Sequence, residues 1–170
     1  ATEQEATPLA ESVPAGLPRV ALLDGAPLAN HEALSGRLVI DDPDDHESRY
    51  TAAQRSHGTA MASLILHGDL SEPGLAPSQP LYVRPILVPH DFYRDVEVTP
   101  KDGLLVDLVI RAFRRMFEGD GTAAPVAPSV RVVNLSVGDP ARVFVRRLSP
   151  LARLLDLFAH QYNLVIIVSA

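Results

Sequence analysis

The chain has no cysteine and no tryptophan among its 170 residues, and only 5% of its residues are aromatic. Without cysteine, a disulfide scaffold, thiolate zinc ligands and a cysteine nucleophile are excluded. Basic residues are also few: 15 Lys and Arg stand against 21 Asp and Glu, a formal charge of −6, so we expect no nucleic-acid partner. Apolar runs are far shorter than the ~20 residues that a bilayer span needs, and the first residues do not resemble a signal peptide.

Proline and hydrophobic residues are plentiful instead. The 15 prolines indicate many turns and loops. A hydrophobic share of 46% is enough for the core of one domain of this length. Residues 1–18 are mostly small or polar, and we expect a flexible leader there, followed by one folded region over residues 19–170.

Short apolar runs alternate with helical patterns along the folded region. The runs are continuous, as expected for parallel strands buried on both faces, and they cover residues 19–23, 37–40, 81–88, 130–136 and 164–169. Helices are expected over 57–67, 102–118 and 151–162, with Asp102 and Ser149 as N-caps of the last two. The order β-β-α-β-α-β-α-β predicts a three-layer α/β fold, a mainly parallel sheet of about five strands with flanking helices.

Functional residues of such sheets lie beyond the carboxyl ends of the strands. Asp24 ends the first strand, and His57 opens the helix of the segment SHGTA. Taken singly, each has a plain structural interpretation, a turn carboxylate and a histidine at a helix start. Gly58 weakens that helix by ~1 kcal/mol relative to alanine, which indicates a close approach to its backbone. Together, Asp24 and His57 predict a carboxylate that holds an imidazole in the tautomer of a general base.

Five segments in the same order resemble blocks of the subtilisin-like serine proteases. VALLDGAPLANHEALSGRL resembles the block of the catalytic Asp, and SHGTAMASLI resembles the His-Gly-Thr block. GLAPSQPLYVRPILV, VRVVNLSVGDP and LVIIVSA resemble the Gly-x-Ala-Pro turn with its strand, the substrate-pairing segment and the strand before the oxyanion hole. The resemblance implies that residues 19–170 are the N-terminal portion of a subtilisin-like peptidase domain.

The resemblance also implies roles for single residues. Asp24 and His57 would be the Asp and His of an Asp-His-Ser triad that hydrolyses peptide bonds in a peptide or protein substrate. The residues expected to bind that substrate are Ser136, Val137, Gly138, Ser169 and Ala170. Members of the family are often secreted, but this sequence alone indicates no compartment.

The sequence departs from the family pattern in three ways. Gly25 stands where the family has Ser or Thr, which removes a hydroxyl next to the Asp24 carboxylate. Ala33 replaces an acidic residue that ligates a structural calcium in many members, so calcium is possible but weakly supported. No serine of the chain has the flanking Gly-Thr of the family's nucleophile, and the oxyanion Asn is also missing. We therefore expect this chain alone to be inactive.

Other interpretations remain open at this stage. Residues 41–47 contain five carboxylates, which suit either a calcium loop or, more simply, a solvated acidic loop. The chain could be a non-catalytic subtilase-like module that binds a peptide or protein. A nucleotide-binding domain that uses Asp24 is disfavoured because no Gly-rich loop follows the first strand. The strand 164–169 is internal in the family, so we expect an exposed edge here that pairs with a second copy or a complementary C-terminal fragment.

Overall fold

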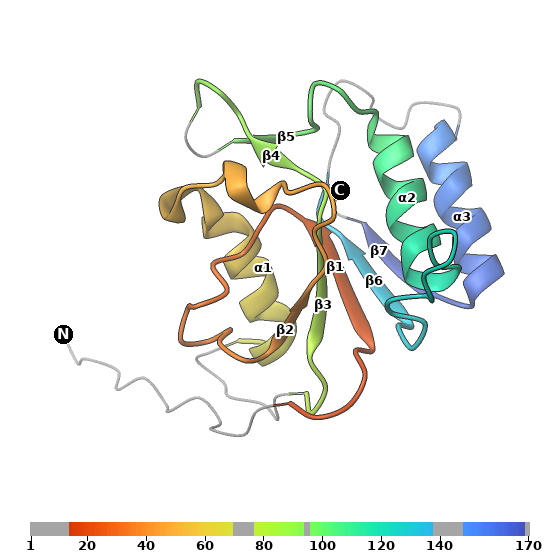
Figure 1. The fold of residues 1–170 in the computed structure, drawn as a ribbon, viewed down its shortest axis with the longest axis horizontal. Helices are drawn as coiled ribbons and strands as arrows, with labels where there is room; N and C mark the ends of the chain where they lie inside the picture. The colour runs from red at the N-terminus through yellow and green to blue at the C-terminus, as the bar shows by residue number, and fades with distance from the viewer. Residues whose placement is uncertain (1–13, 70–76, 94–95, 138–147, 169–170) are drawn as a thin grey trace.

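A five-stranded parallel sheet forms the centre of the structure (Figure 1). The computed structural model describes residues 14–69, 77–93, 96–137 and 148–168. The strand order is β2-β3-β1-β6-β7, and every pairing in this sheet is parallel. The strands are β1 (Val20–Asp24), β2 (Leu38–Ile40), β3 (Leu81–Pro85), β6 (Val132–Leu135) and β7 (Val165–Val168).

Helices cover both faces of this sheet. The α-helices are α1 (Ser56–His67), α2 (Leu105–Phe117) and α3 (Pro150–Tyr162), and two short 3-10 helices, η1 (Glu47–Arg49) and η2 (Ala52–Arg55), precede α1. Helix α1 lies on one face, and α2 and α3 lie on the other (Figure 1). Ala21 and Leu23 of β1 pack with α2 and α3, whereas Leu22 packs with α1. The predicted three-layer α/β fold is confirmed, and its central strand is apolar from Val20 to Leu23 because both its faces are buried.

A small second sheet stands above the carboxyl ends of the main strands. It pairs β4 (Val88–Pro89) with β5 (Glu97–Val98) in antiparallel fashion. The strand expected over 81–88 ends at Pro85, because the amides of Ile86 and Leu87 both turn to the carbonyl of Asp24. The chain then leaves the main sheet and forms the β4–β5 hairpin.

Two predicted helix caps have different outcomes. Ser149 caps α3 as expected, since its Oγ accepts a hydrogen bond from Ala152 N at 3.1 Å. The predicted cap at Asp102 is wrong, because α2 begins three residues later, at Leu105, and its N-cap Leu104 has no side-chain cap. Gly103 N donates to Pro100 O, so these residues form a turn ahead of the helix.

The end of the predicted leader contacts the folded region. Ala15 N donates to Ser78 O, and Pro18 O accepts from Ser129 Oγ. Residues 1–13 lie outside the described residues, so the boundary at residue 18 stays a prediction. Within the described parts of the chain, no helix has the length and apolar character of a membrane span.

Candidate active site at the carboxyl end of β1

Asp24 reaches the site because of the alternation of β1. Side chains two residues apart point to the same face of a strand, so Asp24 shares the α1 face with Leu22. Its side chain is fully buried, and its Oδ1 accepts a hydrogen bond from Gly25 N at 2.8 Å. The strand therefore delivers a buried carboxylate to the start of α1.

His57 reaches the site because the first turn of α1 lies directly on the chain that leaves β1. A Cβ at Gly58 would come within 2.8 Å of Gly25 O, so only glycine permits this approach. Thr59 Oγ1 stabilises the same contact, because it accepts a hydrogen bond from Leu28 N at 2.9 Å and donates one to Arg55 O at 2.6 Å. The close approach predicted at Gly58 is confirmed, and the approaching group is the chain's own backbone.

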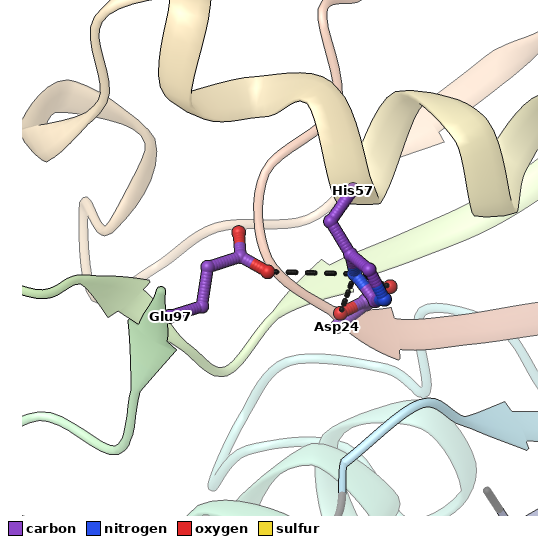
Figure 2. Close-up of side chains that lie close together, drawn as sticks. All are labelled: Asp24, His57 and Glu97. Atoms are coloured by element: carbon purple, nitrogen blue, oxygen red, sulfur yellow. Dashed lines mark hydrogen bonds and ion pairs between the residues drawn. The ribbon is translucent and has the colours of Figure 1, made fainter. Parts of the chain in front are cut away.

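Asp24 and His57 meet as the sequence predicts. His57 Nδ1 lies 3.1 Å from Asp24 Oδ1 (Figure 2). The carboxylate is fully buried, whereas 52% of the imidazole side chain remains exposed. An Nδ1–H that donates to a carboxylate leaves Nε2 of the neutral ring as a proton acceptor. The arrangement is therefore competent for general base chemistry at an accessible ring.

A second carboxylate at this site was not predicted. Glu97 of β5 places Oε2 3.4 Å from His57 Nδ1, and Figure 2 shows the two carboxylates meeting the ring from different sides. Ligand atoms of Asp24, His57 and Glu97 lie within 4.8 Å of one another, close enough to share one divalent ion. The same atoms can instead share a proton, because Nδ1 lies at hydrogen-bond distance from Asp24.

Burial governs the electrostatics of this cluster. It raises the pKa of Asp24, although the His57 ring and the Gly25 amide act in the opposite direction. Burial also raises the pKa of Glu97, against smaller opposing effects of Tyr50 and His57. The pKa of the Tyr50 hydroxyl is raised by burial and by the neighbouring Glu97. Each acid in the cluster thus resists ionisation, which is common at functional sites.

The residues predicted to bind substrate are only partly described. Ser136 and Val137 follow β6, next to the end of β1, where Ser136 N donates to Leu23 O at 3.3 Å. Ser136 Oγ donates to Asn134 Oδ1 at 2.7 Å, and Val137 is buried. Gly138, Ser169 and Ala170 lie outside the described residues.

Two carboxylates of the acidic segment 41–47 form ion pairs with arginines. Asp44 Oδ2 lies 2.7 Å from Nη2 of the buried Arg84, and Asp41 Oδ2 lies 2.9 Å from Arg115 Nε. Arg111 of α2 adds a further bond to Asp44 at 2.7 Å. The solvated-loop interpretation is wrong for these two carboxylates, because arginines of β3 and α2 engage them. An arginine inside the apolar run 81–88 was the available signal.

Comparison with known proteins gives a match at the level of fold. No family model and no curated protein matches the chain. The solved structure of prenylagaramide maturation protease PagA matches with a TM-score of 0.53 at 18% sequence identity, covering 89% of this chain and 44% of that one. The chain therefore has a fold found in a maturation protease and spans less than half of that protein's length.

Proposed function

We propose that the chain is the N-terminal part of a subtilisin-like serine endopeptidase domain. The observation that carries the proposal is the contact of Asp24 with His57 at 3.1 Å, at the carboxyl end of the central strand. The likeness in fold to a maturation protease supports a protease-related function at a coarser level. The block order of the sequence supplies the finer, subtilisin-like class.

The roles of the two residues follow from their contacts. His57 takes the proton of a serine hydroxyl at Nε2 as that oxygen attacks the scissile carbonyl, and then gives it to the leaving amine. Asp24 holds the ring through Nδ1 and stabilises the imidazolium that forms. The reaction class is peptide bond hydrolysis through an acyl-enzyme.

The substrate would bind as an added strand. Backbone groups that follow β6, at Ser136 and Val137, would pair with the main chain of an extended peptide, as would Gly138. Ser169 and Ala170 would border the side chain that precedes the scissile bond. Main-chain pairing of this kind tolerates many sequences, so selectivity would come from the pockets around it.

The nucleophile is the part of the triad that these 170 residues do not supply. None of the chain's serines has the flanking pattern of the family's nucleophile. We expect the gene product that contains these residues to react with a fluorophosphonate probe at a serine elsewhere, and the 170-residue chain alone to stay unlabelled and inactive.

Variants of that gene product test the assignment. His57→Ala and Asp24→Asn should each lower kcat/KM for peptide hydrolysis by roughly 10³–10⁴-fold. His31→Ala is the matched control, since His31 is exposed and belongs to the neighbouring segment, and it should keep wild-type activity. Full activity in His57→Ala would contradict the proposal, and absence of any peptidase activity would favour the non-catalytic peptide-binding module.

A further inference from the structure

Glu97 stands where the resemblance places no catalytic group. Its carboxylate comes from β5 and reaches the same ring nitrogen as Asp24, at 3.4 Å against 3.1 Å. Only 11% of its side chain is exposed. Burial of a charged carboxylate costs free energy unless the charge interacts with a partner. Glu97 lies on a strand of only two residues, and the imidazole of His57 is next to its carboxylate.

The chain makes room for this carboxylate at Gly25. A Cβ at residue 25 would come within 1.8 Å of Glu97 Oε1 and 2.7 Å of the Tyr50 hydroxyl oxygen. The space that a serine or threonine side chain would fill next to Asp24 is thus occupied by Glu97. The Glu97 carboxylate can therefore occupy this position only because residue 25 has no side chain.

The cluster has few hydrogen-bond donors for its two carboxylates: the Gly25 amide and the His57 ring at Asp24, and the Tyr50 hydroxyl at Glu97. Among the described residues, Asp24 Oδ2 and Glu97 Oε1 are buried and make no hydrogen bond of ordinary geometry, although Asp24 Oδ2 lies 3.1 Å from His57 Nδ1. Arg55 lies over the Tyr50 ring at 5.9 Å but is engaged by Glu47 at 2.6 Å. The facing groups are then two carboxyls, one phenol and one imidazole, so a proton retained within the cluster is what satisfies it.

We propose that Glu97 is a positioning residue that holds His57 from a second side and shares one proton with the ring and Asp24. The proposal rests on the triad assignment for its link to catalysis, but the contact itself does not. With both carboxylates ionised and the ring neutral, two buried negative charges would face each other across Nδ1. The cluster therefore keeps its last proton to a higher pH than an Asp–His pair alone.

The test follows the His57 ring by NMR, using the 15N shifts of its nitrogens and the low-field signal of Nδ1–H in the full chain, with a chelator present. Glu97→Gln keeps the shape of the side chain and removes its charge. We expect the pH at which the cluster releases its last proton to fall by about one unit, because a negative charge next to the ring is lost. Asp91→Asn, an exposed carboxylate of the same hairpin paired with Lys101, should leave it unchanged.

Gly25→Ala provides the second variant. Its Cβ must displace the Glu97 carboxyl, which is the end of a flexible side chain, and must also shift the Tyr50 hydroxyl 2.7 Å away, so a thermal unfolding curve is recorded to check that the variant is folded. It should lower the same midpoint by a similar amount, and the Gly25→Ala/Glu97→Gln double variant should shift no further than Glu97→Gln alone. Additive shifts would contradict a shared mechanism.

The outcomes separate this inference from the proposed function. An unchanged midpoint in Glu97→Gln overturns the role of Glu97, whatever the peptidase assays show. If the titration midpoint of the cluster shifts in Glu97→Gln but the gene product has no peptidase activity, the contact of Glu97 with His57 is supported and the triad assignment is rejected. A wild-type midpoint that moves when the chelator is left out shows that an ion occupies the cluster, and this also overturns the inference.

Discussion

Asp24 is buried where its charge lowers the stability of the fold. Burial raises its pKa in the folded chain above the unfolded value, and contact with His57 offsets this only in part. A carboxyl of this kind binds its proton more tightly in the folded state, so the free energy of unfolding falls as pH rises above the unfolded pKa of about 4. A residue that costs stability at neutral pH is typical of a functional site.

Asp24→Asn should therefore stabilise the chain at neutral pH. Above pH 7 we expect its free energy of unfolding to exceed that of wild type by on the order of 2 kcal/mol, and the gain should vanish as pH approaches 4. Urea unfolding at several pH values measures this. Asp102→Asn, an exposed residue that caps no helix, is the control. If the free energy of unfolding of wild type rose relative to that of Asp24→Asn with increasing pH, the charge of Asp24 would not be destabilising.

The elements on the β3 side of the sheet are joined by ion pairs rather than by apolar contacts alone. Asp41 accepts from Arg115 of α2 and from Tyr82 of β3, and Arg84 lies within 3.7 Å of it. Burial acts to raise the pKa of Asp41, but the hydrogen bonds from Arg115 and Tyr82 and the charges of Arg84 and Arg115 together outweigh it, so the pKa is lowered. This contribution to stability is present above the unfolded pKa and is lost as pH falls through the folded one.

Asp41→Asn should accordingly destabilise the fold. We expect a loss of about 1–3 kcal/mol at pH 7, because the buried Arg84 and the partly exposed Arg115 lose a charged partner. The difference from wild type should shrink below about pH 4. Asp45→Asn, an exposed residue of the same loop, is the matched control. Equal losses in both variants, or a loss that does not depend on pH, would rule out this role for Asp41.

The elements that could be predicted are those with a strong local signal. Continuous apolar runs indicate strands buried on both faces, and a carboxylate at the end of one run indicates the functional edge of a parallel sheet. Asp24 and His57 follow from this reasoning together with the family resemblance. The start of α2 was missed because Asp102 has the chemistry of a cap but lies in a turn.

Glu97 could not be found in the same way. Strands β4 and β5 have two residues each, too few for any periodicity to appear. Its meeting with His57 depends on where the hairpin folds over the sheet, which no local pattern encodes. One hint was indirect, the glycine at position 25 where a hydroxyl was expected.

At the scale of the whole molecule, β7 forms one edge of the described sheet. It pairs with β6, and no other described strand pairs with it. Val165, Ile167 and Val168 are 61%, 50% and 40% exposed. An apolar edge strand without lysine or proline is prone to pair with other chains.

We expect the isolated 170-residue chain to self-associate, or to pair with a complementary fragment, through this edge. Light scattering at micromolar concentration should show species larger than a monomer, and Val165→Lys should shift them toward the monomer because it charges the edge. Leu157→Lys changes an exposed leucine of α3 and is the control. A wild-type chain that is monomeric and indistinguishable from Val165→Lys would exclude association through β7.

The joint at Gly58 has a consequence for how such a site can vary. Helix α1 packs at Gly58 directly against the backbone that leaves β1, with no side chain between them. The spacing of Asp24 and His57 is therefore set by main-chain contact. Glu97, by contrast, arrives on a hairpin that stands apart from the main sheet (Figure 1). The hairpin takes no part in the main-chain contact at Gly58. Exchanging the hairpin would remove the second contact of the His57 ring and change the acidity of the pair, while the main-chain contact between α1 and the chain that leaves β1 would stay.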